Sequence, residues 1–434
     1  MKLAVHEDRL DNGLRIVTVP RPGLSRAHVY VQLRGGPVHE DDDTWGLSHL
    51  VEHMVFRGTD LHADLAALTL GADDFGGDLG AATYRDRVTF DTRLDPERVA
   101  DAFALLASMI AAPRLQKLGV ERAIIEEEIS DLFDDDGKDV DAENAVFRHL
   151  FHGHVLARPI EGRPELLRRY DKRIVRAFHR RVYSAQNVVV SIAGPVTRVR
   201  VLAAARRAFA RVPSGETPAL GRAPAAGRTR GRVHVVRSEA MQTSVRLCGL
   251  LPGHGLGGKG TVSPDVAAAY VLARLLDDGP ASRLQSRVVD RDGLAYSVWA
   301  MADLYEERGC LEIGGSVRPD RAAALVSALI RELAALAARP PSKDELSRIC
   351  ARAARDARDA LDDPDALAES AGRGALFGRS WHPNRELAAM HAVTPSRVQR
   401  LAALAKDSAH LVLSGEVTRS AATSALRAMA QLGG

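Results

Sequence analysis

The chain has 434 residues, of which 46% are hydrophobic and 26% are charged, and its formal net charge is +3. This length exceeds one ordinary domain and predicts at least two hydrophobic cores. The near balance of charge argues against a nucleic-acid-binding surface. The first residues lack the apolar core of a signal peptide, and no apolar run reaches the roughly 18 residues that a membrane-spanning helix needs.

Cysteine is scarce in this chain. Cys248, Cys310 and Cys350 are the three cysteines, and all lie far from the motif described below. Buried free thiols in a reducing compartment are the simplest interpretation of so few cysteines in an odd number. With neither a targeting segment nor a membrane span, we expect a cytoplasmic protein that binds no membrane and no nucleic acid.

The first predicted elements are two strands joined by a turn, over residues 13–37, followed by a short helix. This helix carries the sequence HLVEH at residues 49–53, which is H-x-x-E-H, the inverted form of a zinc-protease signature. Residues four apart lie on one face of a helix, so His49 and His53 can aim at one metal ion. Glu52 lies on nearly the same face and can accept a proton from water.

The motif by itself leaves an ordinary alternative open, because two histidines on one helix can also be surface or core residues. The flanking sequence favours a helix, with Thr44 as the expected N-cap and Gly58 at the expected end. A catalytic zinc takes three protein ligands and leaves a fourth position for water. A third ligand is therefore required.

A candidate third ligand lies in the predicted helix over residues 121–130, ERAIIEEEIS. Glu121 and Glu128 are two helical turns apart, so their carboxylates point the same way. The alternative is a solvated acidic helix face, and Glu126 and Glu127 fit that interpretation. Glu128 or Glu121 could complete the ligand set.

The chain repeats its pattern after roughly 220 residues. Residues 231–254 have the same strand–turn–strand plan as residues 13–37. Residues 213–230 are rich in Pro, Gly, Ser and Ala, which is typical of a linker. We therefore predict an α+β fold with two homologous domains, 1–212 and 231–434, each an antiparallel-rich sheet backed by helices.

The second half lacks the metal motif. Its helix near residues 267–276 has Tyr270 and Arg274 close to where the histidines would stand. The duplication therefore predicts one catalytic half and one supporting half.

Taken together, these features resemble the M16 metallopeptidases, the family of pitrilysin, insulysin and mitochondrial processing peptidase. The resemblance covers most of the chain. It rests on HLVEHMVFRGT at residues 49–59 with Glu128 downstream, LDNGLR at 10–15, YSAQNVVVSIAG at 183–194 and GLAYSV at 293–298.

The resemblance implies a role for each residue of the motif. His49, His53 and Glu128 would bind Zn2+, Glu52 would be the catalytic base, and Glu121 would support the site from behind the ligands. The implied activity is that of a zinc endopeptidase, which encloses peptides or unfolded segments in a chamber between two two-domain halves. One chain of this length corresponds to one half, so a second M16-like chain is the expected partner.

Two positions depart from the family pattern. Gly80-Ala81 stands where an asparagine followed by alanine is common. Tyr296 matches a tyrosine that grips substrate, but the arginine that should accompany it, seven residues earlier, is Val289. Arg287 and Arg291 lie nearby, and on a helix they point off the required face. Tyr296 could equally be a buried tyrosine at the start of a core strand.

The incomplete grip bears on the choice of partner. A homodimer is the commonest arrangement of soluble oligomers. We nevertheless favour a heterodimer, in which another chain supplies the arginine and tyrosine that hold the substrate. The alternative function is a non-catalytic assembly or core subunit of an M16-type complex, which the presence of all four zinc-site residues disfavours.

Overall fold

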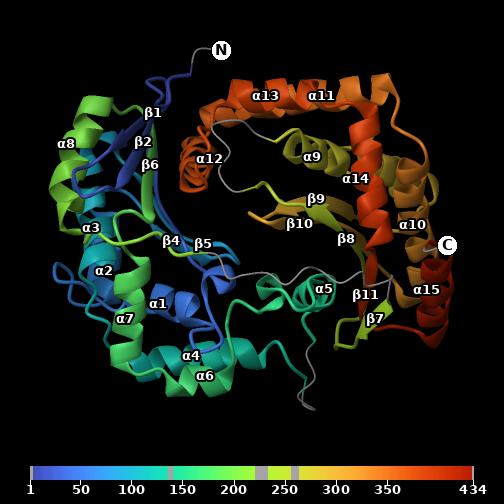
Figure 1. Ribbon diagram of the computed structural model, residues 1–434, viewed down its shortest axis with the longest axis horizontal. Helices are drawn as coiled ribbons and strands as arrows, with labels where there is room; N and C mark the ends of the chain where they lie inside the picture. Colours follow the sequence, from blue (N-terminus) through green and yellow to red (C-terminus); the bar gives the residue numbers. More distant parts are fainter. Residues whose placement is uncertain (1–2, 135–139, 220–232, 256–262, 433–434) are drawn as a thin grey trace. The chain divides into compact units, whose positions relative to one another are not determined.

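The computed structural model describes residues 3–134, 140–219, 233–255 and 263–432. The chain forms two compact units, each drawn from three separate segments (Figure 1). The first unit comprises Met1–Ser130, Pro159–Arg222 and Ala357–Pro383, and the second comprises Asp131–Arg158, Ala223–Asp356 and Asn384–Gly434.

The first unit is built on a six-stranded sheet with the strand order β1-β2-β6-β3-β5-β4. Neighbouring strands are antiparallel, except that β2 and β6 run parallel. Strand β4 forms one edge of the sheet. The strands are β1 His6–Arg9, β2 Arg15–Pro20, β3 Ala27–Arg34, β4 Leu79–Thr83, β5 Arg87–Leu94 and β6 Val188–Gly194.

Helices cover one face of this sheet and bury its main core. Apolar residues of the strands pack against α1 (Leu47–Val55), α3 (Val99–Ala111), α7 (Lys172–Val182) and α8 (Arg198–Ala208). Three further helices, α2 (Leu65–Asp73), α4 (Leu118–Ser130) and α6 (Pro164–Arg169), complete this side. Helix α1 packs against α4, α7 and the edge strand β4, which places the predicted metal helix at the edge of the sheet.

The second unit repeats this plan. Its sheet has the order β7-β11-β8-β10-β9, and its one parallel pair is β7 with β11, as β2 is with β6. The predicted duplication is thus confirmed at the level of strand order. The strands are β7 Val233–Val236, β8 Thr243–Pro252, β9 Val298–Leu304, β10 Arg308–Val317 and β11 His410–Gly415.

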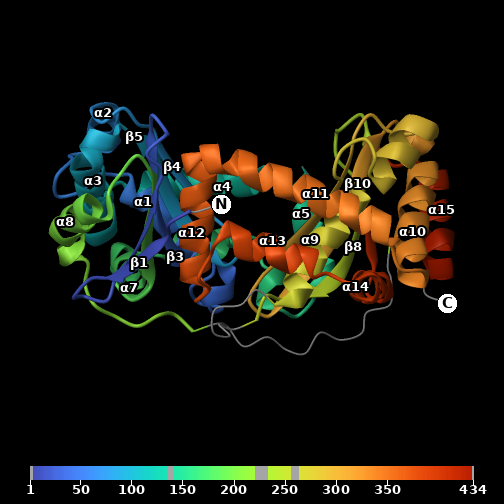
Figure 2. The same cartoon turned by 90° about the horizontal axis from the view of Figure 1, so that it is seen from above.

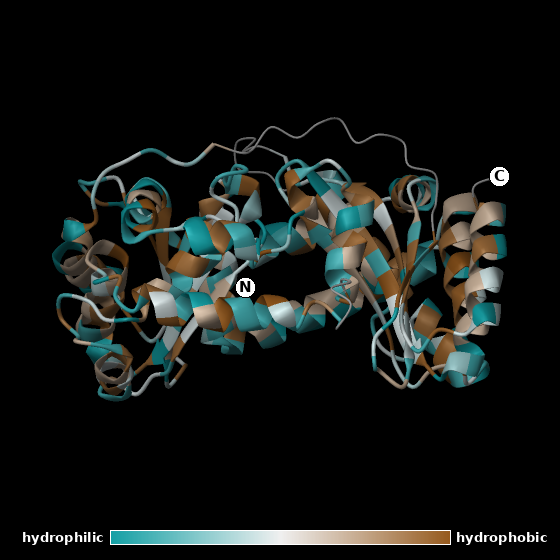
Figure 3. Ribbon diagram, turned by 90° about the horizontal axis from the view of Figure 1, so that it is seen from below, coloured by the Kyte–Doolittle hydropathy of each residue, from teal (hydrophilic) through white to brown (hydrophobic). Residues whose placement is uncertain are grey.

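Helices back the second sheet in the same way. Its core is shared with α9 (Pro264–Leu276), α10 (Ala322–Ala338), α14 (Pro395–Asp407) and α15 (Arg419–Leu432). Two more helices, α11 (Lys343–Asp359) and α13 (Pro383–His391), lie between α10 and α14 in the sequence. Figure 3 shows that the helices are two-sided, with hydrophobic residues on one side and hydrophilic residues on the other. Among the described residues, no helix is long and apolar enough to cross a membrane.

Each half of the chain gives one helix to the other unit. Helix α5 (Ala142–Leu150), from the first half, packs on β7, β8 and β11 of the second unit. Helix α12 (Pro364–Leu376), from the second half, packs on β2, β3 and β6 of the first unit (Figures 1 and 2). The strands covered by α5 and α12 are equivalent in the two sheets, so the exchange is reciprocal.

This exchange means that packing does not divide the chain into two contiguous pieces. The ranges 1–212 and 231–434 remain a prediction about the repeat in the sequence, whereas each compact unit also contains a segment from the opposite range. The physical reason is burial. Val17, Val189 and Ala193 on the second face of the first sheet are covered by Leu367 and Ala371 of α12. Most of the expected linker, residues 213–230, lies outside the described residues.

Candidate metal centre

Helix α1 begins differently from the prediction, although it carries the expected residues. Its N-cap is Gly46, with φ 92°, and Thr44 instead hydrogen-bonds with Asp41. The backbone N–H groups at the helix start are satisfied by Glu40, whose carboxylate oxygens accept from Gly46 N at 2.9 Å and Ser48 N at 2.7 Å. The prediction of Thr44 as N-cap is therefore wrong, because a buried carboxylate from the preceding segment occupies that role.

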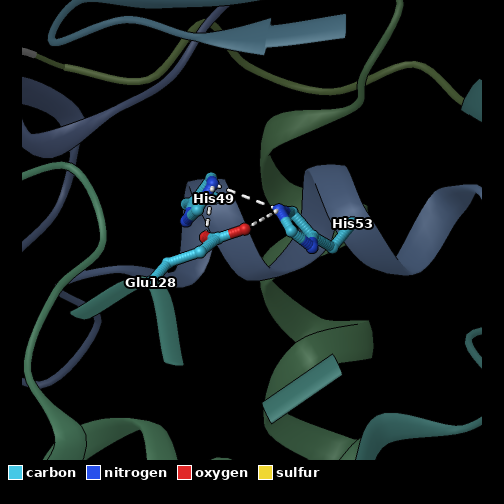
Figure 4. Close-up of side chains that lie close together, drawn as sticks. All are labelled: His49, His53 and Glu128. Atoms are coloured by element: carbon cyan, nitrogen blue, oxygen red, sulfur yellow. Dashed lines mark hydrogen bonds and ion pairs between the residues drawn. The ribbon is translucent and has the colours of Figure 1, made fainter. Parts of the chain in front are cut away.

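Three side chains converge at this helix (Figure 4). The Nε2 atoms of His49 and His53 are 3.2 Å apart. Glu128 reaches in from α4, with Oε2 3.7 Å from His49 Nε2 and Oε1 3.9 Å from His53 Nε2. One ligand atom from each of the three lies within 4.8 Å of the others, and no other such group of three His, Cys, Asp or Glu occurs in the described parts of the chain.

These separations suit a zinc ion. Zinc–nitrogen and zinc–oxygen bonds of about 2.0–2.2 Å in tetrahedral geometry place ligand atoms roughly 3.3–3.5 Å apart. The three observed distances bracket that range. Glu128 remains 41% exposed, so solvent reaches this ligand; a zinc ion held by the three residues would use a further ligand such as water. The donor set of two imidazoles and a carboxylate is one that zinc prefers.

A buried carboxylate fixes the tautomer of His53. Glu121 is 2% exposed, and its Oε2 lies 3.0 Å from His53 Nδ1. An ionised carboxylate only accepts, so Nδ1 carries the proton and Nε2 presents its lone pair toward His49 and Glu128. Arg57 donates to the other oxygen of Glu121 and compensates its buried charge.

The pKa values of the two histidines are shifted in opposite directions. Burial, with the neighbouring His53, lowers the pKa of His49 to about 3, so this imidazole is neutral and able to bind a metal. Burial alone would lower the pKa of His53. The hydrogen bond that His53 donates to Glu121 and the charges of Glu52 and Glu128 outweigh burial and raise the pKa of His53. The same carboxylates would favour a metal cation at this position.

Glu52 lies beside the ligands without joining them. Its carboxylate is buried, and Thr83 at the end of β4 donates a hydrogen bond to Oε2 at 2.9 Å. Burial raises the pKa of Glu52, Thr83 and His53 lower it, and Glu128 raises it further, with a net upward shift. A carboxylate with a raised pKa is suited to take and return a proton near neutral pH.

The departure at Gly80 has a visible cause. Gly80 pairs with Asp91 across β4 and β5, and a Cβ at Gly80 would lie 2.5 Å from Asp91 Oδ1. His28 holds that carboxylate, with Nε2 2.9 Å from Asp91 Oδ2. The space that an asparagine side chain would use is thus taken by Asp91.

In the second unit, the tyrosine Tyr296 is exposed, and the two arginines considered as its partners are paired with acidic residues. Tyr296 is 98% exposed, so it is not a buried core residue. Val289 is partly buried against the second core. The segment Gln285–Arg291 is a π-helix, so α-helical spacing does not describe where its side chains point. Arg287 pairs with buried Glu332, and Arg291 pairs with Asp292.

The second unit also has no histidines in its counterpart of the metal helix. Tyr270 lies on α9, and Arg274 bonds to Asp278 and Asp356. Charge pairs of this kind stabilise the helix surface and provide no metal ligands.

Comparison with known proteins identifies the family of this chain. Residues 15–163 match the family "Insulinase (Peptidase family M16)", and residues 171–352 match "Peptidase M16 inactive domain". An uncharacterized zinc protease of Mycobacterium tuberculosis is 30% identical over 324 residues, covering 74% of this chain and 72% of that protein. The chain belongs to peptidase family M16.

Solved protease structures share the fold over nearly the whole of this chain. A protease from Helicobacter pylori aligns with a TM-score of 0.85 at 19% identity, covering 95% of this chain and all of that one. The periplasmic protease PqqL from Escherichia coli aligns with a TM-score of 0.79 at 19% identity, covering 100% of this chain but 50% of that one. This M16 chain therefore corresponds in length to half of the larger protein.

Proposed function

We propose that this M16 chain is the catalytic half of a zinc-dependent endopeptidase that cleaves peptides or unfolded segments. The observation that supports the proposal most strongly is the convergence of His49, His53 and Glu128 with Glu52 beside them. Three ligand residues, two from helix α1 and one from the distant helix α4, meet with separations that suit zinc. Packing of the hydrophobic core does not by itself require these polar side chains to converge.

The chemistry follows from the groups present. Zinc bound by the three ligands would activate water and polarise the scissile carbonyl as a Lewis acid. Glu52 takes the proton of the attacking water and passes it to the departing amine nitrogen. Glu121 holds His53 in the tautomer that presents Nε2, and Arg57 keeps Glu121 ionised. Strand β4 offers a free edge, on which an extended peptide can pair through its backbone.

The decisive experiment separates metal binding from catalysis. Glu52→Gln keeps the shape of the side chain and all three ligands but cannot accept the proton. We expect about one zinc per chain to be retained by elemental analysis, and peptide cleavage to fall by a factor on the order of 100 or more.

Glu128→Gln should lose zinc, whereas Glu127→Gln, on the exposed face of the same helix, should keep it. Wild-type protein that takes up no added zinc would refute the proposal and favour the non-catalytic assembly subunit.

We further propose that the chain works with a second M16-like chain in a heterodimer. Tyr296 is exposed, and the two arginines closest to the expected position in the sequence, Arg287 and Arg291, are held by acidic residues. The half-length match to PqqL also suits a chain that needs a second half. Purified alone, the chain should cleave unstructured peptides poorly. Robust turnover by a homodimer would favour the symmetric arrangement instead. We propose a cytoplasmic location, consistent with three buried cysteines that form no disulfide.

A further inference from the structure

Thr83 stands between two parts of the candidate active site. It is the last residue of the edge strand β4, and its hydroxyl donates to Oε2 of Glu52 at 2.9 Å. Among the described residues, no other side chain or backbone group hydrogen-bonds to the Glu52 carboxylate. The second carboxylate oxygen, Oε1, has no hydrogen-bond partner among these residues.

A second hydroxyl lies near Glu52 without reaching it. Tyr183 is fully buried, and its hydroxyl has no hydrogen-bond partner in the described parts of the chain. Burial raises the pKa of Tyr183, and the charge of Glu52 raises it further. In the part of the chain that the structure describes, Thr83 is therefore the one group that orients the carboxylate by a direct hydrogen bond.

The geometry points to Thr83 as a positioning residue for the proposed base: its hydroxyl binds Oε2 of Glu52, which leaves Oε1 as the oxygen that takes the proton from water. This inference rests on the proposed function. A carboxylate on an unrestrained side chain samples several rotamers, and a misplacement of about 1 Å can cost a hundredfold in rate. A hydrogen bond that fixes one oxygen of the carboxylate also limits the positions of the other oxygen.

The hydroxyl of Thr83 is not required to hold the strand. Strand β4 pairs with β5 through backbone bonds along its whole length, and Thr83 pairs with Val88. The bond to Glu52 thus joins the base to the strand on whose free edge a peptide can pair. The same strand would set both the register of the substrate and the position of the base.

Three variants test the inference. Thr83→Val removes the hydroxyl at nearly constant shape, and Thr83→Ser retains it. Thr89→Val is the matched control, because Thr89 is a buried threonine on the adjacent strand β5 whose hydroxyl donates to the Ala82 carbonyl at 3.4 Å. Each protein is assayed as the active complex for zinc content, thermal stability, kcat and KM on unstructured peptides.

We expect Thr83→Val to keep its zinc and its KM within about twofold while kcat falls about tenfold or more. Thr83→Ser should recover most of the wild-type kcat, and Thr89→Val should match wild type. A crystal structure of Thr83→Val should show the Glu52 carboxylate rotated from its place.

Equal kcat in Thr83→Val and wild type, failure of Thr83→Ser to recover activity, or an unmoved Glu52 would each overturn the inference. Failure of the proposed function is recognised separately, by a wild-type complex that neither binds zinc nor cleaves peptide; the inference then falls with it.

Discussion

The Nδ1 atom of His53 lies 3.0 Å from Glu121 Oε2, and this contact orients a metal ligand from the side opposite the metal. Replacing Glu121 with Gln removes the charge that favours the Nδ1 proton and the cation beyond it. We expect zinc affinity to fall about tenfold or more, measured by competition with a chelator. Glu126→Gln, on the same helix but partnered with Arg168, is the control and should leave affinity unchanged. An unaltered affinity in Glu121→Gln would show that Glu121 only fills space.

The carboxylate of Glu40 caps the N-terminus of the metal helix α1. Glu40→Ala leaves the N–H groups of Gly46 and Ser48 buried without that acceptor. We expect the free energy of unfolding to fall by about 1–3 kcal/mol and zinc affinity to fall with it.

Asp64→Ala removes the N-cap of α2, where Asp64 accepts from Ala67 N at 3.0 Å. This control should lose stability by about 1 kcal/mol and keep its zinc affinity. Equal effects of the two variants on zinc binding would mean that Glu40 has no special link to the site.

The Tyr183 hydroxyl is buried without a hydrogen-bond partner among the described residues. Tyr183→Phe removes that unsatisfied group and keeps the ring, which packs beside His179 and Phe90. We expect unfolding in urea to show a gain of about 1 kcal/mol, since a buried unpaired hydroxyl costs roughly 1–3 kcal/mol. A loss of stability would reveal a partner, such as a bound water, for this hydroxyl.

His39 and His179 predict acid sensitivity of the first unit. Burial lowers the pKa of each to about 4, which backbone hydrogen bonds to Ala219 and Ile110 offset only in part. Below pH 6.5 the unfolded chain takes up protons that the folded chain does not, so stability falls as pH drops from 6.5 to about 4.

The loss should be on the order of a few kcal/mol in urea titrations. His179→Gln should reduce the dependence by about 1.4 kcal/mol per pH unit in that window. An unchanged slope would exclude His179 as a contributor.

Much of the site could be predicted because its signals are local. His49, Glu52 and His53 lie within two turns of one helix, and Glu121 and Glu128 are two turns apart on another. Helical periodicity therefore places each set on a face before any tertiary contact is known. The repeat was also predictable, because strand order followed the two matching strand–turn–strand segments.

The features that could not be predicted depend on contacts between distant segments. Glu40 replaces Thr44 as the capping group because burial brings it to the helix start. Thr83 was ordinary in sequence, and its importance comes from the place where β4 ends beside α1. The π-helix at Gln285–Arg291 has no local signature that separates it from an α-helix. Tertiary packing determines the Glu40 cap, the position of Thr83 and the π-helix.

The exchange of α5 and α12 has a consequence for synthesis on the ribosome. The second face of the first sheet, with Val17 and Val189, is covered by residues 361–377. These residues emerge only after most of the chain has been made. The unit that carries the metal helix therefore cannot complete its core during translation of its own half. Its final folding step waits for the second half, so a chain truncated before α12 would leave this apolar face open to chaperones and proteases.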